Sequence, residues 1–337
     1  MNRIPSLDGW RGVAITLVLL EHIQGTMHRS IPGPWTNTGQ HGVTIFFVLS
    51  GFLITTKLLE GPIDLKRFYL RRFFRLLPVV WVYLIVIWLF GKAIGIQTLT
   101  STEVVSCLFI FRNFLGHLGQ GLTASFWSLS IEEQFYLVWP CLLLLAGGRR
   151  ARWFALAGAL LCSGYRLLNW DFYNHLYLSF RTEVRADALL IGCLVSLLLN
   201  EPSFRPLACR WSKVLALPAG AIVLFCVTRF PYLPPLTESV AIAVLIVASV
   251  VHPNSLMARP LSFRPLAWLG TISYSLYVWN LFFFLISGSV LSEIVMMCLM
   301  FCFALASYYV IERPATRLGH RLTSIAGRPN PAQTELA

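Results

Sequence analysis

Residues 8–22 read DGWRGVAITLVLLEH, an apolar run that contains an acid, a guanidinium and an imidazole. Arg11 and His22 are eleven residues apart in this run. At about 100° per residue they share one helix face and lie about 16 Å apart along the axis, with Asp8 about 40° from that face. Such groups are costly in lipid, so they usually face a bundle interior or a polar cavity and mark function. The alternative is a structural ion pair beside a histidine whose hydrogen bonds are satisfied.

The composition of the whole chain is that of a membrane protein. Of its 337 residues, 56% are hydrophobic and 12% are charged, and the mean hydropathy is +0.68. Soluble domains carry roughly 25% charged residues, so we expect an all-α, polytopic integral membrane bundle. A span needs about 20 residues, and about ten apolar stretches approach that length. They lie near residues 10–28, 41–59, 76–96, 127–146, 151–168, 184–200, 212–229, 235–252, 268–287 and 290–311.

The formal net charge of +12 follows the expected topology of this bundle. If the N-terminus is cytoplasmic, alternate connections hold 19 of the 27 lysines and arginines, and the opposite connections hold seven. This is the positive-inside pattern. We therefore expect a multi-pass protein of the cytoplasmic (inner) cell membrane with both termini cytoplasmic, which contacts the lipid bilayer and no nucleic acid. The first residues show no cleavage site of a signal peptide.

We expect one transmembrane domain, residues 1–325, and a disordered tail, residues 326–337. The short apolar piece Cys107–Phe111 cannot span a bilayer and should lie at the interface or dip back into the bundle. The eight cysteines form no Cys-x-x-Cys pair or His/Cys cluster, so we expect no metal site. Three longer connections could roof a cavity on the outer side; they are residues 29–40, 97–126 and 169–183.

A basic segment lies between the second and third apolar stretches. Its cations alternate with aromatic residues at helical spacing and are Lys66, Arg67, Arg71, Arg72 and Arg75. Arginine is the preferred bidentate partner of phosphate, so a cluster at the membrane edge can hold a polyphosphorylated cosubstrate. The alternative is an interfacial helix whose cations contact anionic lipid.

Two adjacent carboxylates enter the fourth apolar stretch, which opens with the sequence FWSLSIEEQFYLVWP from residue 126. Glu132 and Tyr136 are i, i+4 partners on one helix face, while Glu133 points elsewhere. Glu132 and His22 are each about six residues, or about 9 Å, below the outer end of their helices, so they can lie at the same depth. A carboxylate beside an imidazole fixes its tautomer and raises its basicity, which suits a general base. The alternative for Glu132 is a structural hydrogen bond.

Polar groups also stand in two further stretches. Arg181, Arg185 and Asp187 open the sixth stretch on the outer side, where they could hold an acceptor or form salt bridges at the helix entry. Ser50 and Gly51 lie in the middle of the second stretch. The Gly-x-Ser-x-Gly pattern of a nucleophile elbow is missing there. We therefore interpret this small pair as a close helix contact rather than a nucleophile.

Taken in order, these motifs resemble acyltransferase family 3 of integral membrane proteins. The matching motifs extend over roughly residues 3–320. They are Arg11 followed after ten residues by His22, FFVLSGF from residue 46, Arg71-Arg-x-x-Arg, WSLSIEEQFY from residue 127, Arg185-x-Asp-x-Leu, SYSLY from residue 273 and Glu312-Arg-Pro. The resemblance implies a ten-helix bundle that moves an acyl group, usually acetyl, from cytoplasmic acyl-CoA to a carbohydrate hydroxyl. It also implies that Arg11 and His22 are needed for activity and that the arginine motif serves CoA.

The chain departs from this family at Asn280, where many members carry a histidine. It also ends without the esterase-like domain fused to some members, so we expect transfer to be completed within the bundle.

These inferences combine into one expected function, an O-acyltransferase that uses acyl-CoA, usually acetyl-CoA, as cosubstrate and has no permanently bound cofactor. The acceptor would be a carbohydrate or a glycosylated or lipid-linked molecule. The expected catalytic residues are His22 as general base, Glu132, Arg11 and Asp8. Those expected to bind acyl-CoA are Lys66, Arg67, Arg71, Arg72 and Arg75. Those expected to bind the acceptor are Tyr136, Arg181, Arg185, Asp187 and Asn280. The alternative is a transporter or flippase for a sugar or an acyl compound, although we find no clear inverted repeat.

Overall fold

The computed structural model describes residues 4–26, 38–91, 99–115, 121–169, 180–229, 235–284 and 290–325. Within these ranges the chain forms helices and their connections, without a β-strand. This agrees with the all-α prediction. The predicted tail at residues 326–337, and much of the three predicted outer connections, lie outside the described residues.

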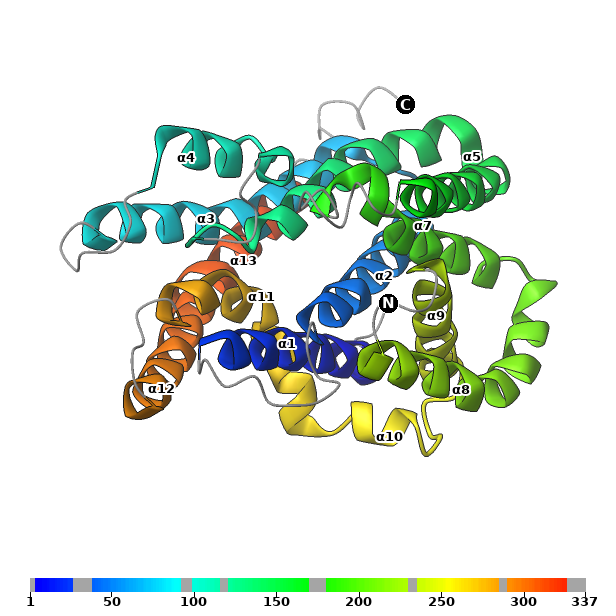
Figure 1. Ribbon diagram of the computed structural model, residues 1–337. Helices are drawn as coiled ribbons and strands as arrows, with labels where there is room; N and C mark the ends of the chain where they lie inside the picture. Colours follow the sequence, from blue (N-terminus) through cyan, green and yellow to red (C-terminus); the bar gives the residue numbers. More distant parts are fainter. Residues whose placement is uncertain are drawn as a thin grey trace, which may run out of the picture.

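The helices follow one another through the chain as Figure 1 labels them. They are α1 (Pro5–Thr26), α2 (Thr38–Leu58), α3 (Leu65–Gly91), α4 (Ser101–Leu108), a 3₁₀ turn (Arg112–Phe114), α5 (Phe126–Leu168), α7 (Thr182–Leu199), α8 (Phe204–Arg229), α9 (Pro235–Val251), α10 (Ala258–Leu261), α11 (Arg264–Phe284), α12 (Val290–Ala306), a π-helix (Ser307–Glu312) and α13 (Arg313–Ile325).

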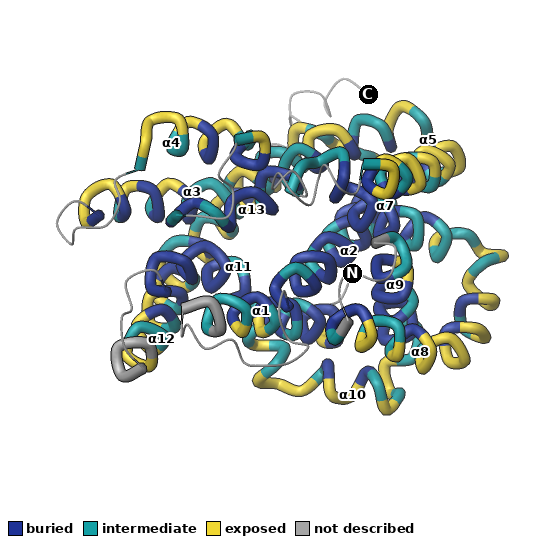
Figure 2. The backbone as a smooth tube through the Cα atoms, viewed as in Figure 1, coloured by how far each residue is buried: buried dark blue, intermediate teal, exposed yellow. Residues whose placement is uncertain are grey.

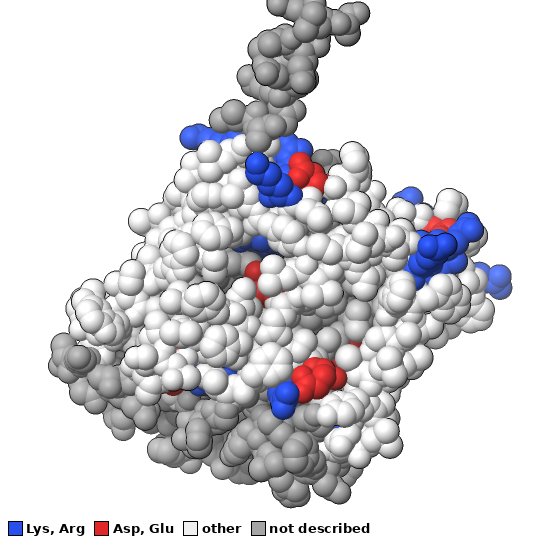
Figure 3. Space-filling view, turned by 90° about the horizontal axis from the view of Figure 1, so that it is seen from above, with Lys and Arg blue, Asp and Glu red and all other residues white. Residues whose placement is uncertain are grey.

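The centre of the bundle is built from α1, α2, α7 and α11. The helix α1 packs along both α11 and α2, and α2 packs along α7. Figure 2 shows these helices largely buried, whereas α3, α5, α8 and α12 turn exposed residues outward. Many of those exposed residues are large and apolar. The face in Figure 3 is mostly uncharged, with charged side chains gathered at its edges and in a hollow. Such a surface suits lipid rather than water.

Among the described residues, five helices are long and apolar enough to cross a membrane: α2, α3, α5, α8 and the continuous run Ile294–Ser324. A sixth apolar segment, Leu236–Val251, is shorter. Each of the ten predicted stretches overlaps a helix. The protein is therefore a multi-pass membrane protein, and ten remains the predicted number of spans.

Two predicted spans, residues 127–146 and 151–168, form one run of 43 residues that is broken at Gly147. Gly147 has φ 70° and ψ 158°, a conformation that glycine adopts without the steric penalty of a side chain. The run is thus two helices joined at this glycine, and both halves are counted as α5.

Glycines also set the tight contact between α2 and α7. A Cβ placed on Gly51 would lie 1.9 Å from the carbonyl oxygen of Leu189, and one on Gly192 would lie 2.1 Å from that of Val48. No side chain fits at either position. The prediction of a close helix contact at Gly51 is confirmed.

The basic segment differs from its predicted placement in a connection. The helix α3 begins at Leu65, eleven residues before the predicted span, so Lys66 to Arg75 form its first turns. Hydropathy places the start of the span too late because the arginines are polar, although their helical spacing continues into the apolar run. As a result these cations belong to the helix that continues into the apolar run instead of lying on a separate helix.

Candidate active site

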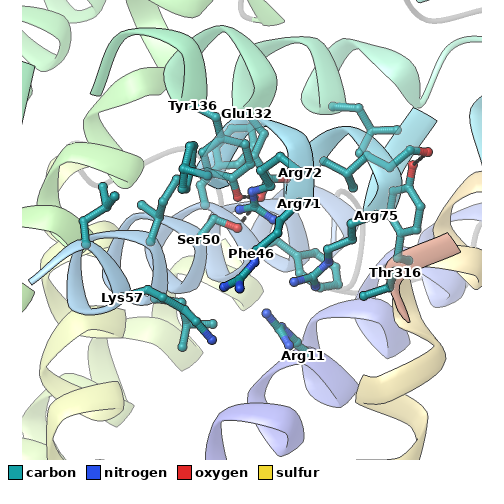
Figure 4. A pocket seen from close by; sticks show the side chains of 18 of the residues that line it. Arg11, Phe46, Ser50, Lys57, Arg71, Arg72, Arg75, Glu132, Tyr136 and Thr316 are labelled. Carbon is teal, nitrogen blue, oxygen red and sulfur yellow. Dashed lines mark hydrogen bonds between the residues drawn. The ribbon is translucent and has the colours of Figure 1, made fainter. Parts of the chain in front are cut away.

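A cavity of about 340 Å³ opens at the end of the bundle where α2 ends and α3 begins, which we call the basic end. Side chains of α1, α2, α3, α5, α11 and α13 line it (Figure 4). The lining includes both Leu58 and Val43 of α2, which are about 22 Å apart along the helix axis. Since Val43 is only five residues from the start of α2, the cavity penetrates most of the bundle.

Positive charge dominates the cavity lining. Its six cations are Arg11, Lys57, Arg67, Arg71, Arg72 and Arg75. Its two carboxylates are Asp64 and Glu132. Figure 4 shows several of the labelled cationic groups pointing into one common space. Six cations against two carboxylates leave an excess of four positive charges, and an enclosed positive site of this kind attracts a polyanion.

The regular turn of α3 brings most of the predicted phosphate-binding residues to this cavity. Arg67, Arg71 and Arg75 are spaced by four residues and share a face. Arg71 is held in place because its Nε donates a hydrogen bond to Thr323 Oγ1 at 2.9 Å, from α13. Lys66 is nine residues before Arg75, half a turn away in angle, and it is exposed and absent from the lining. The structure therefore gathers four of the five predicted residues and leaves Lys66 outside.

Glu132 forms the polar centre of the cavity. Its Oε1 accepts hydrogen bonds from the Ser50 hydroxyl of α2 and from the Tyr136 hydroxyl one turn along α5. The guanidinium carbon of Arg72 lies 3.7 Å from the centre of the Tyr136 ring. A carboxylate, two hydroxyls and a guanidinium thus meet in one place. Interpreting Ser50 only as part of a helix contact missed this hydrogen bond.

His22 lies elsewhere. It faces Asn280 of α11, and its ring centre is 6.2 Å from that of Phe284. It is not among the residues that line the cavity. The pairing of His22 with Glu132 stays a prediction, because equal depth does not by itself make two side chains face each other. The helix α1 packs along α11, whereas Glu132 on α5 points to Ser50 of α2.

The other two predicted catalytic residues lie near the start of α1. Arg11 Nη1 is 3.5 Å from Asp8 Oδ1, so this part of the structure contains the ion pair considered as the alternative. Arg11 also lines the cavity, whereas Asp8 does not. Asp8 is fourteen residues from His22, about 21 Å along the helix, which is too far to orient the imidazole directly.

The predicted acceptor residues are divided between several places. Arg181 forms an ion pair with Glu183 at 2.6 Å, in agreement with the salt-bridge alternative at the helix entry. Arg185 and Asp187 are buried, and the Arg185 guanidinium carbon lies 5.6 Å from the ring centre of Trp127. Of the five residues predicted for the acceptor, only Tyr136 lines the cavity.

Several cavity residues were missed by the sequence reasoning: Ser128, Tyr274, Tyr277, Thr316 and His320. Three of them lie in the motifs WSLSIEEQFY and SYSLY. Their place in these motifs was the only feature of the sequence that could have pointed to them. Ser128 and Tyr277 are hydrogen-bonded through their hydroxyls at 2.5 Å. Tyr274 donates to the carbonyl oxygen of Leu76 at 2.8 Å, which fixes α11 against α3.

Metal and thiol chemistry find no support in the described part of the chain. No group of three or more His, Cys, Asp or Glu side chains there could hold a metal ion. The short helix α4 ends close to Cys107, whose burial raises the pKa of its thiol to about 12. That thiol stays protonated at neutral pH and is a poor nucleophile.

The fold and the cavity define a multi-pass membrane protein with a deep, positively charged cavity. The chain belongs to the acyltransferase domain family, whose profile matches residues 4–313. This confirms the resemblance drawn from the motifs.

Its relatives are O-acetyltransferases by name. The chain is 33% identical over 314 residues to the peptidoglycan O-acetyltransferase OatA of Listeria monocytogenes, with 82% of this chain and 49% of the relative covered. It is 32% identical to the putative peptidoglycan O-acetyltransferase YrhL of Bacillus subtilis, over 94% of this chain and 56% of the relative. The chain thus spans about half the length of these relatives. No solved structure matches it significantly.

Proposed function

We propose that this protein transfers an acetyl group from acetyl-CoA to a hydroxyl of a carbohydrate acceptor. The main support is the cavity, whose six cations suit the phosphates of CoA and whose far end holds a carboxylate and hydroxyls. The relatives named as peptidoglycan O-acetyltransferases support a carbohydrate acceptor. Those names also favour transfer over transport.

The donor would enter at the basic end. Arg67, Arg71, Arg72 and Arg75 would hold the CoA phosphates, because guanidinium groups bind phosphate oxygens in pairs. The pantetheine arm would then pass Arg11 and bring the thioester towards Glu132, Ser50 and Tyr136. Because acyl-CoA is made in the cytoplasm, this reaction places the basic end on the cytoplasmic face of the inner membrane. Both chain termini then face the cytoplasm.

The acceptor would approach from the other end, where His22 lies. His22, oriented by Asn280 rather than by Glu132, would take the proton of the acceptor hydroxyl as general base. The hydroxyl oxygen then bonds to the acyl carbon and the carbon–sulfur bond breaks. The proton ends on the CoA thiol, so the reaction is balanced without a further reactant. Arg185, Asp187 and Arg181 would help to hold the acceptor.

The test uses purified protein in lipid nanodiscs with radiolabelled acetyl-CoA and peptidoglycan fragments. Wild type should move label to the fragments, and His22→Ala should be slower by about 10² to 10⁴-fold, the usual cost of losing a general base. Arg152→Gln is the control, since Arg152 forms an exposed ion pair with Glu201 away from the cavity. If wild type does not bind acetyl-CoA, the proposal is refuted and the transporter alternative is favoured. An active His22→Ala would remove only the base assignment.

A further inference from the structure

A second set of buried charged groups lies at the end of the bundle opposite the basic end. It comprises His41 of α2, Arg166 of α5, Arg185 and Asp187 of α7, and Glu238 of α9, which we call the charge cluster. All five side chains are less than a tenth exposed. None of them lines the donor cavity. Four helices contribute to the cluster, which is costly to bury unless its charges interact.

The contacts within the charge cluster are specific. His41 Nδ1 lies 2.7 Å from Glu238 Oε1. Asp187 interacts electrostatically with both Arg166 and Arg185, and each of these arginines also interacts with Glu238. The cluster therefore holds two arginines, two carboxylates and an imidazole.

Some of its hydrogen-bonding capacity is unused. Arg185 Nη2 and Asp187 Oδ2 are buried, and no other atom of the described residues accepts from the first or donates to the second. Leaving such atoms unsatisfied costs about 1–3 kcal/mol each, or more for charged groups. An unsatisfied donor and an unsatisfied acceptor suit a ligand that both gives and takes hydrogen bonds, as a sugar does through its several hydroxyls.

The charge cluster lies close to the opposite surface. His41 is three residues from the start of α2, Glu238 three from the start of α9 and Arg166 two from the end of α5. Each is thus about 3–5 Å along its helix from the end of that helix.

The cluster is also connected to the donor cavity. Tyr277 lines that cavity, and its hydroxyl interacts electrostatically both with Glu132 of the cavity and with Arg185 of the cluster. The hydroxyl of Tyr277, which is hydrogen-bonded to that of Ser128, is therefore near enough to both sites to interact with each. Asn280, which faces His22, is one turn beyond Tyr277 on α11 and donates to its carbonyl oxygen at 2.6 Å.

The charge balance differs between the two sites and decides what each can bind. The donor cavity has six cations and two carboxylates, whereas the charge cluster has two arginines and two carboxylates beside the imidazole of His41. A balanced cluster has no net attraction for a polyanion but offers both donors and acceptors to an uncharged polar molecule.

We propose that the charge cluster binds the acceptor as a neutral sugar unit and presents its hydroxyl at the Tyr277–Ser128 pair. This inference rests on the proposed function and adds His41, Arg166 and Glu238 to the acceptor site. The sugar enters from the surface opposite the basic end, and its hydroxyls satisfy Arg185 and Asp187. Acetyl transfer then joins the sugar oxygen to the acyl carbon as the thiol leaves on the other side of the pair.

The test measures half-saturation by the acceptor and by acetyl-CoA separately, with an N-acetylglucosamine trisaccharide as the neutral probe. Asp187→Asn should raise the acceptor half-saturation about 10-fold or more, the effect of losing one hydrogen bond to a charged group. The acetyl-CoA half-saturation should stay within about twofold, because the distant donor site is independent. Arg152→Gln is again the control.

Asp187→Asn leaves buried arginines with less compensating charge and could fail to fold. Asp187→Glu keeps the charge and displaces the carboxylate by one methylene, so in a protein of unchanged Tm it should still raise the acceptor half-saturation. Wild-type acceptor half-saturation in both folded variants, or a parallel rise for both substrates, would overturn the proposal. Wild type that binds acetyl-CoA but does not modify the trisaccharide would also overturn it. Absence of acetyl-CoA binding would instead refute the proposed function.

Discussion

Replacing Arg75 by glutamine should weaken acetyl-CoA binding far more than replacing Lys66 by glutamine. Both changes remove one positive charge from the first turns of α3. They differ in position: Arg75 lines the cavity, whereas Lys66 is exposed and outside the lining. The comparison separates a phosphate site from a general attraction between the basic end and anionic lipid.

The expected sizes follow from the helix geometry. A hydrogen bond to a charged group is worth about 1.5–3 kcal/mol, so Arg75→Gln should weaken binding about 10- to 100-fold. Lys66 is about 13 Å from Arg75 along the axis and on the opposite face. Because Lys66 is exposed to solvent and outside the lining, water and salt screen its charge even from a ligand held by the adjacent Arg67, so Lys66→Gln should change binding by no more than about twofold.

The assay is equilibrium binding of radiolabelled acetyl-CoA to protein in nanodiscs of neutral lipid, repeated with anionic lipid. The neutral lipid removes the lipid-anchoring role of the cations, so any remaining effect belongs to the ligand. Equal losses for Arg75→Gln and Lys66→Gln would refute the argument from the cavity. So would an Arg75→Gln loss seen only with anionic lipid.

Three further predictions concern the centre of the bundle. Glu132→Gln should lower kcat with little change in acetyl-CoA half-saturation, because the amide keeps the shape but loses the charge that Ser50 and Tyr136 contact; an unchanged kcat in a transfer assay would contradict this. If only the charge of Arg11 matters, Arg11→Lys should keep part of the transfer activity that Arg11→Ala loses. Equal activities of the two variants would show that charge alone is not enough. Gly192→Ala should lower Tm in a thermal unfolding assay, since its Cβ would lie 2.1 Å from a carbonyl oxygen; a Tm equal to wild type would show that α2 and α7 can separate freely.

The positions of the helices could be predicted from the sequence because apolar runs are local signals. Each predicted stretch overlaps a helix, and the apolar composition of the exposed helices can be read directly from the sequence. The start of α3 could not be predicted in this way. Hydropathy counts the arginines against a membrane span, although they belong to the same helix as the span. The break at Gly147 was expected as a connection, and the structure makes it a single positive-φ residue.

The candidate site was predictable only in part because rotation of one helix against another is a non-local property. Helical spacing correctly placed Arg71 and Arg75 one turn apart on one face, since that depends on α3 alone. Depth alone paired Glu132 with His22, but packing turns Glu132 towards Ser50 and His22 towards Asn280. A residue such as Tyr277 enters the site only through the approach of α11 to α5, which no local pattern encodes.

The separation of His22 from the cavity has a consequence for the chemistry. If the base lined the donor cavity, water admitted with acetyl-CoA could be activated in place of the acceptor, and the thioester would be hydrolysed. In the structure Tyr277 and Ser128 line the cavity, whereas Asn280, which His22 faces, lies one helical turn beyond Tyr277 and outside the lining. Under the proposed function, the base meets the donor only when an acceptor hydroxyl bridges that pair. Tyr277→Ala removes this barrier and should therefore raise the rate of acetyl-CoA hydrolysis relative to the rate of acetyl transfer. An unchanged ratio of the two rates would show that Tyr277 does not separate the base from the donor.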